Sequence, residues 1–101
     1  MIKVVEILDV NLNQIICGLS NNDIKRVKLQ PLISNHKHLK GIEKLRSKDY
    51  IRLVEIGMLG EIFWPETIIS SAGDTCNYDI SSEYIYHFGE DFDLESKEIA
   101  G

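Results

Sequence analysis

The chain has 101 residues, of which 44% are hydrophobic, and its 16 acidic and 11 basic residues give a net charge of −5. This length fits one domain, and aliphatic residues spread along the sequence argue against wholesale disorder. No apolar stretch approaches the about 20 residues of a membrane span, and the N-terminal residues lack the apolar run of a secretion signal. We therefore expect a soluble, cytoplasmic protein with no membrane partner.

Three β-strands are predicted in the first third of the chain. Residues 2–10, 14–19 and 24–29 are rich in β-branched and aliphatic side chains. The intervening segments "DVNLN" and "SNND" consist mostly of residues that favour turns. We expect these strands to form an antiparallel meander, and we expect Pro31 to end it.

A short amphipathic helix is predicted next, because Ile42 and Leu45 lie three residues apart and are flanked by charges. Ser47 is expected to begin one further helical turn. After it, residues 53–64 alternate as a β-hairpin would, with the turn at Leu59 and Gly60. The alternating apolar positions of this hairpin are Val54, Ile56, Met58, Ile62 and Trp64.

The only tryptophan, Trp64, is predicted to be a core residue. It shares a strand face with Ile62, and Pro65 cannot donate to a sheet ladder, so the strand is expected to end there. A ligand platform and an interface anchor are the alternatives. A core position is favoured because large aromatic residues dominate core energetics and no other aromatic residue accompanies Trp64 at a suitable spacing.

The last elements expected are a strand near residues 78–80 and a helical turn over residues 84–86. Ser81 or Ser82 is predicted to cap this turn and Gly89 to end it. Residues 90–101 are acidic and have little to bury, so we expect them to form a flexible tail.

These elements predict one compact α+β domain over residues 1–89. Its parts are an antiparallel three-strand meander, a short helix, a β-hairpin and a C-terminal helical turn, arranged in two layers. Leu53 and Phe63 fall on the hairpin face opposite Ile56 and Trp64. Apolar residues on both faces predict either a second covered layer or a homodimer interface.

Four short motifs occur in order along the chain: "IKVVEI" at the start, the stretch from Leu29 through Pro31 to Leu32, "GEIFWP" at 60–65 and "DISSEYIY" at 79–86. Over residues 2–88 this arrangement resembles a small bacterial family, domain of unknown function 2442. The residues that carry the last two motifs are Gly60, Trp64, Pro65, Asp79 and Tyr86.

The resemblance implies a compact α+β domain with an antitoxin-like or partner-binding role, because such genes often lie beside small toxin-like genes. It implies no catalytic residue. The chain departs from the family where Glu66 and a long segment separate Pro65 from Asp79, and where Ser82 replaces a common proline. The shape of the 66–78 loop is therefore not implied by the resemblance.

Charge is unevenly distributed along the chain. Residues 25–52 have a net charge of +7, residues 53–101 one of −10, and residues 1–24 one of −2. The basic segment could present a patch to a nucleic-acid backbone or an acidic partner, or it could be an ordinary solvated surface. The solvated surface is favoured because the patch lacks interleaved aromatic residues and the chain is acidic overall. The candidate patch residues are Lys25, Arg26, Lys28, Lys37, Lys40, Lys44, Arg46 and Arg52.

A third alternative is that the acidic tail folds back over this basic segment and competes with a partner. Removing residues 90–101 would then raise the affinity of the chain for a polyanion, and heparin retention would measure that change.

Neither a metal centre nor an active site is indicated. Zinc sites usually need three or four ligands, and nothing near His36 and His38 completes such a set, so we expect no metal and no cofactor. No spacing favours a nucleophile and base pair, so an enzyme is the least favoured hypothesis. The side chains from which an active site would have to be built are Ser70, Ser71, Cys76 and His87, or the pair Asp79 and Glu83.

The leading hypothesis is therefore a non-enzymatic binding module whose partner is another protein, with a homodimer as an alternative. Weak nucleic-acid or polyanion binding through residues 25–52 is second.

Overall fold

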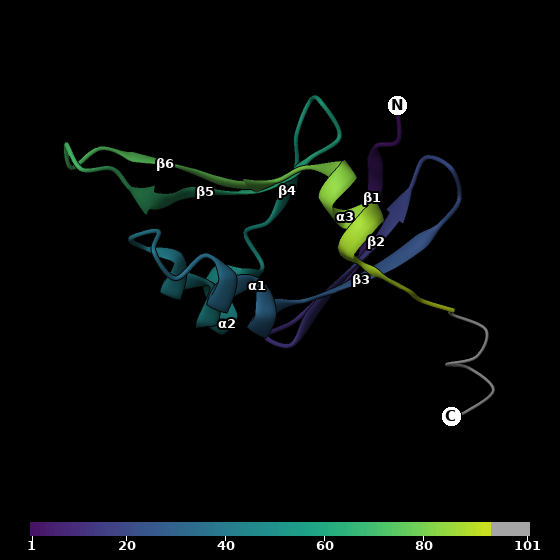
Figure 1. Cartoon of the computed structure of the whole chain (residues 1–101), viewed down its shortest axis with the longest axis horizontal. Coiled ribbons are helices and arrows are strands. Elements are labelled where there is room, and N and C mark those ends of the chain that lie inside the picture. Colours follow the sequence, from purple (N-terminus) through teal and green to yellow (C-terminus); the bar gives the residue numbers. More distant parts are fainter. Residues whose placement is uncertain (94–101) are drawn as a thin grey trace.

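The computed structural model describes residues 1–93, and it confirms the predicted α+β fold. Two antiparallel sheets lie side by side, one of four strands in the order β1-β2-β3-β7 and one of three in the order β4-β5-β6 (Figure 1). Helical segments lie beneath the three-stranded sheet, and α3 lies between the two sheets (Figure 1). The strands are β1 (Val4–Val10), β2 (Gln14–Leu19), β3 (Ile24–Lys28), β4 (Glu55–Ile56), β5 (Ile62–Ile69), β6 (Thr75–Ile80) and β7 (Glu90–Asp91).

The predicted meander is confirmed, but a helix that the sequence interpretation missed follows it. Strand β3 ends at Lys28, and helix α1 (Leu29–Asn35) begins directly after it. Pro31 lies in the first turn of α1, where a missing N–H costs nothing because that group has no helical partner. The expectation that Leu29 continues the strand was wrong. Leu29, Leu32 and Ile33 are buried at helical spacing instead.

The two predicted helical turns are present. Ile42 and Leu45 are buried on the short 3₁₀ helix η1 (Ile42–Arg46). Helix α2 (Lys48–Ile51) begins after Ser47, whose hydroxyl accepts a hydrogen bond of 3.3 Å from the N–H of Tyr50. No helix within residues 1–93 is long and apolar enough to cross a membrane.

The predicted hairpin of residues 53–64 forms over a shorter length than expected. Strand β4 has only two residues, which pair with Ile62 and Phe63 of β5. Met58, expected on a strand face, is 97% exposed. It lies in a turn that closes earlier, where the N–H of Gly57 donates to the carbonyl of Glu61 at 2.7 Å.

The expectation that β5 ends at Pro65 was wrong, because a bulge takes up the proline. The register with β6 shifts between Trp64 and Ile68, so three residues of β5 oppose Asn77 alone. Pro65 sits in this bulge, where no ladder hydrogen bond is required of it. Glu66, at φ 52°, donates its N–H to the side-chain oxygen of Asn77 at 3.2 Å.

Trp64 is a core residue, as predicted. Its side chain is 0% exposed, and its indole N–H donates to the carbonyl oxygen of Ile51 at 3.0 Å. Its ring stacks on Tyr78 with ring centroids 5.8 Å apart. The indole therefore joins the inner face of the three-stranded sheet to the end of α2.

The C-terminal elements extend past the predicted domain boundary at residue 89. Helix α3 (Ser82–Phe88) is capped by the Ser81 hydroxyl, which accepts from the N–H of Tyr84 at 3.1 Å, and Gly89 follows the last helical residue. Glu90 and Asp91, expected in a flexible tail, form β7 and pair with β3. Residues 94–101 of the predicted tail lie outside the described residues.

Candidate binding surfaces

The basic residues of β3 are engaged by β7. Lys25 Nζ lies 2.6 Å from Asp91 Oδ1. Arg26 and Lys28 lie 3.2 and 3.4 Å from the carboxylate of Glu90, and their hydrogen bonds lower the pKa of Glu90. Three of the eight candidate patch residues are therefore partly neutralised within the chain.

The remaining patch residues lie on the helical segments and beside them. Arg46 pairs with Glu43, and it also donates to the side chain of Gln30 at 3.0 Å. Lys44 donates to the carbonyl of Glu66 at 3.4 Å, with its ammonium 5.9 Å from the ring centroid of Tyr50. The other patch residues in this part of the chain, Lys37, Lys40 and Arg52, are exposed.

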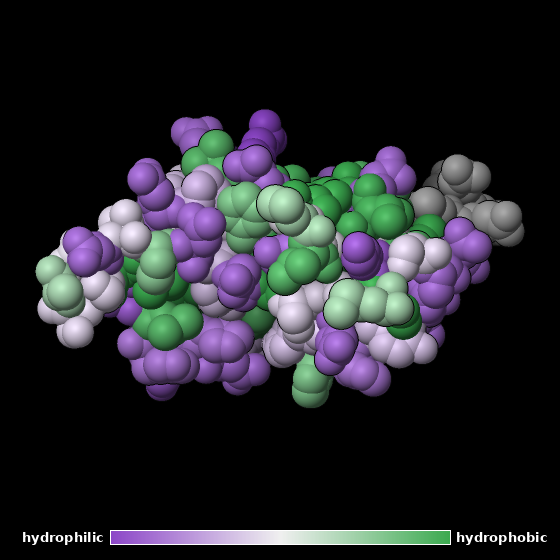
Figure 2. Space-filling view, turned by 90° about the horizontal axis from the view of Figure 1, so that it is seen from above, coloured by the Kyte–Doolittle hydropathy of each residue, from purple (hydrophilic) through white to green (hydrophobic). Residues whose placement is uncertain are grey.

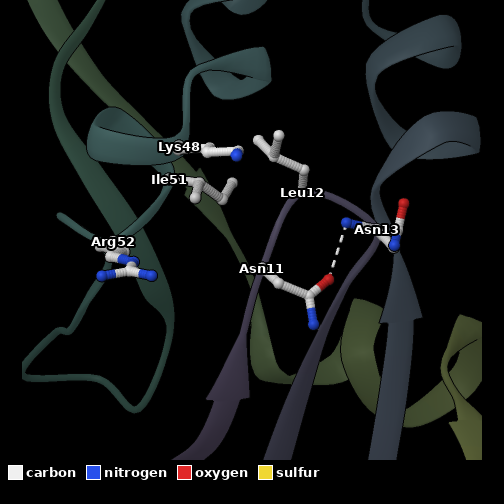
Figure 3. A pocket seen from close by; sticks show the side chains of 6 residues that line it. All are labelled: Asn11, Leu12, Asn13, Lys48, Ile51 and Arg52. Atoms are coloured by element: carbon white, nitrogen blue, oxygen red, sulfur yellow. Dashed lines mark hydrogen bonds between the residues drawn. The ribbon is translucent and has the colours of Figure 1, made fainter.

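Arg52 contributes to a cleft of about 410 Å³ between the β1–β2 turn and α2, which we call the cationic cleft (Figure 3). Its cations are Arg52 and Lys48, and neither takes part in an ion pair within residues 1–93. On the opposite wall, Asn11 Oδ1 accepts from the N–H groups of Asn13 and Gln14 at 2.8 and 3.1 Å, which fixes the turn. The other lining residues are Leu12 and Ile51.

A second surface lies on the outer side of the three-stranded sheet, where two hollows of about 520 and 280 Å³ adjoin. They share Leu59, Glu61 and Asp79 in their walls. Hydrophobic residues lie among hydrophilic ones on this side of the molecule (Figure 2). We call this surface the apolar–acidic face, and define it by Met1, Ile56, Met58, Leu59, Glu61, Phe63, Asp79 and Glu83.

Two apolar residues of this face lie in the β4–β5 turn and are exposed to solvent. Met58 and Leu59 are 97% and 71% exposed. The Glu61 carboxylate accepts from the N–H of Leu59 at 3.1 Å, and the N–H of Gly60 donates to the carbonyl of Gly57 at 3.0 Å. The turn thus has a defined, hydrogen-bonded conformation that presents two large apolar side chains to water.

The acidic residues of the face are available to a partner. None of Glu61, Asp79 and Glu83 takes part in an ion pair among the residues that the structure describes. Phe63 lies between Glu55 and Asp79 in the strand register, so an aromatic ring is flanked by carboxylates. This arrangement suits a partner surface that carries both apolar and basic groups.

The structure brings Asp79 and Glu83 together in the wall of one hollow, but it does not bring the serine and cysteine candidates to His87. Cys76, Ser70 and Ser71 belong to the β5–β6 hairpin, whose turn lies at the end of the molecule far from α3, the helix that carries His87 (Figure 1). Burial raises the pKa of the other thiol, Cys17, to about 12, which keeps it protonated at neutral pH.

His36 and His38, the candidate metal ligands, have ring centroids 6.3 Å apart. Within residues 1–93 no group of three or more His, Cys, Asp or Glu side chains is placed to hold a metal ion. His36 Nδ1 instead lies 2.8 Å from the hydroxyl of Tyr78, so it belongs to the packing around Trp64.

The residues that carried the family resemblance lie on different surfaces. Trp64 lies in the core and Pro65 in the bulge of β5, whereas Asp79 belongs to the apolar–acidic face and Gly60 lies in the turn beside it. Tyr86 lies beside β3, with its ring centroid 5.3 Å from Lys25 Nζ. Comparisons with protein-family models, curated proteins and solved structures find no match. The resemblance therefore stays a prediction.

Sequence interpretation missed the apolar–acidic face because it assigned Met58 to a strand. The available signal was the stretch "GMLGE", in which two glycines enclose two apolar residues. Such spacing is typical of a turn, and Met is enriched at protein interfaces.

Proposed function

We propose that this chain is a non-enzymatic binding module that binds another protein through its apolar–acidic face. The supporting observation is the ordered β4–β5 turn, which leaves Met58 almost fully exposed and Leu59 largely exposed beside two hollows. Exposed apolar residues gathered in one place mark interaction sites more often than scattered ones do. An ordered turn also lowers the entropic cost of binding.

The carboxylates of the face define the chemistry of the partner. Glu61, Asp79 and Glu83 favour a partner with lysine or arginine side chains around an apolar centre, and they disfavour a nucleic-acid backbone at this surface. A small basic protein in the bacterial cytoplasm, regulated or neutralised by this chain, is the partner that we propose. This role agrees with the antitoxin-like function that the family resemblance implies.

Replacing Met58 and Leu59 with serine is expected to abolish tight partner binding without unfolding the chain. The partner is captured from a bacterial lysate on the immobilised chain, washed at low and then high salt, purified and rebound to each variant. We expect Met58→Ser/Leu59→Ser to weaken binding about tenfold or more, because a few central apolar residues dominate interface energies. Stability should change by less than about 0.5 kcal/mol for each exposed residue.

A matched control removes two other exposed apolar residues, Val5 and Leu53, which are 60% and 48% exposed. Val5→Ser/Leu53→Ser should bind the purified partner like the unaltered chain. An equal loss of partner binding in both double variants would contradict the proposal. Recovery of a second copy of the chain alone would assign the face to a homodimer instead.

We propose anion binding in the cationic cleft as a second candidate function, because Lys48 and Arg52 border it without an ion-pair partner within residues 1–93. Lys48→Gln/Arg52→Gln is expected to elute from heparin at lower salt than the unaltered chain. Lys37→Gln/Lys40→Gln removes the same charge elsewhere and serves as the control. Identical elution of the two double variants would show that net charge alone governs retention, and would contradict a role for the cleft.

A further inference from the structure

Strand β7 occupies the outer edge of β3 as an added strand. The register pairs Lys25 with Asp91 and Arg26 with Glu90 in antiparallel orientation. The N–H of Phe92 then donates to the carbonyl of Ile24 at 3.0 Å. Backbone groups of β3 at the edge of the sheet are therefore bound by a short acidic segment.

The side chains of this segment are matched to both faces of the sheet. Consecutive residues of a strand point to opposite faces. Asp91 meets Lys25 on one face, while Glu90 meets Arg26 and Lys28 on the other. The ring centroid of Phe92 lies 5.8 Å from the Arg26 guanidinium. The edge of β3 thus binds a segment of two acidic residues followed by an aromatic one.

Few interactions attach β7 to the edge of β3. Strand β3 has five residues, and β7 pairs with two of them. The side chains of Asp91 and Glu90 are 88% and 48% exposed, so water competes with the β3 cations for both carboxylates. Arg26 Nε is buried and has no hydrogen-bond acceptor among the residues that the structure describes. A buried donor without an acceptor costs free energy, which another ligand could recover.

We propose that the outer edge of β3 binds an extended acidic segment of a partner protein by strand addition, and that β7 competes for this edge within the chain. A peptide fits better than a nucleic acid because β7 binds through backbone hydrogen bonds and places one carboxylate on each face. This site is separate from the apolar–acidic face and does not depend on the function proposed for it.

The test uses a fluorescent peptide with the sequence of residues 88–93, Phe-Gly-Glu-Asp-Phe-Asp, and the full chain. In the variant Glu90→Gln/Asp91→Asn, strand β7 loses its ion pairs with β3. The edge of β3 therefore becomes more accessible to the peptide. Fluorescence anisotropy is expected to give about tenfold tighter peptide binding to this variant than to the unaltered chain. Added salt should weaken this binding.

Two controls separate this site from general charge effects. Glu6→Gln/Asp74→Asn removes one glutamate and one aspartate outside the β3–β7 pair, and should bind the peptide like the unaltered chain. The neutral peptide Phe-Gly-Gln-Asn-Phe-Asn should bind none of the proteins tightly. Equal peptide affinity in both double variants would overturn the proposal, as would a gain for heparin without a gain for the peptide.

A measurement on the unaltered chain does not depend on the variant folding. Because β7 is tethered to β3, it competes at an effective concentration on the order of millimolar. Peptide added at several times this concentration should shift the backbone amide NMR signals of residues 24–28. Signals of Glu90 and Asp91 should move in the same titration because β7 is displaced. Unchanged signals at saturating peptide would overturn the proposal.

Discussion

Replacing Trp64 with alanine is expected to lower the free energy of unfolding by about 3–5 kcal/mol. The indole is fully buried, stacks on Tyr78 and donates to the carbonyl of Ile51. Alanine removes the ring, leaves a cavity beneath the sheet and deprives that carbonyl of its donor. Small domains have a total stability of about 5–15 kcal/mol, so this loss would leave the chain near its folding limit. Urea denaturation followed by far-UV circular dichroism measures it.

Trp64→Phe retains part of the packing while it removes the hydrogen bond. Phenylalanine keeps a six-membered aromatic ring but cannot donate to Ile51, so we expect a smaller loss, about 1–3 kcal/mol, from the unsatisfied carbonyl and the reduced ring volume. Circular dichroism is the appropriate probe because Trp64 is the only tryptophan, and both variants lack its fluorescence. A loss below about 1 kcal/mol for Trp64→Ala would be typical of a surface residue, and would contradict the buried position.

Gly41→Ala is expected to destabilise the chain strongly, although it adds only one methyl group. Gly41 has φ 105°, and a Cβ at this position would overlap with the carbonyl oxygen of Thr67. Thr67 is fully buried in the bulge of β5, and its hydroxyl bonds to the carbonyl of Trp64 at 3.0 Å. A left-handed conformation costs alanine about 1–2 kcal/mol, and overpacking about 1–3 more. We expect a total loss of about 2–5 kcal/mol.

Gly73→Ala is the matched control for this substitution. Gly73 also has a positive φ, of 90°, but a Cβ there would meet nothing within 4 Å. Gly73→Ala should therefore lower the free energy of unfolding by only about 1–2 kcal/mol, the cost of the left-handed conformation for alanine. The difference between the two variants in urea denaturation therefore measures the close approach of Gly41 to β5. Equal losses would show that backbone conformation alone matters and that the helical segment can move away from the sheet.

Burial of Trp64 and the binding surfaces are connected through the three-stranded sheet. Its inner face packs Ile62 and Trp64 against the helical segments, so that the alternate residue Phe63 faces outward beside Asp79. The same β5 backbone thus fixes the core on one side and part of the apolar–acidic face on the other. A variant that weakens the core is therefore unsuitable for testing the face, whereas Met58 and Leu59 lie outside the packed interior.

The sequence by itself determined those elements whose signals are local. Turn residues separate the three strands of the meander, Ser47 and Ser81 cap helices with their own hydroxyls, and Ile42 and Leu45 are buried at helical spacing. Trp64 was also predictable as a core residue, because its alternation with Ile62 places both on one strand face.

Other features were decided by tertiary structure. The sequence around Pro65 predicts the end of a strand, yet β5 continues. Its bulge is held by Thr67 within the bulge and by Asn77 and Tyr50 from other parts of the chain. The sequence from Glu90 onward predicts a polar tail. In the structure the carboxylates of Asp91 and Glu90 accept hydrogen bonds from Lys25 and Arg26, which lie 66 and 64 residues earlier in the chain. No local pattern encodes such partners. Whether a proline interrupts a strand, or an acidic segment is ordered, depends on groups that only folding brings within hydrogen-bonding distance.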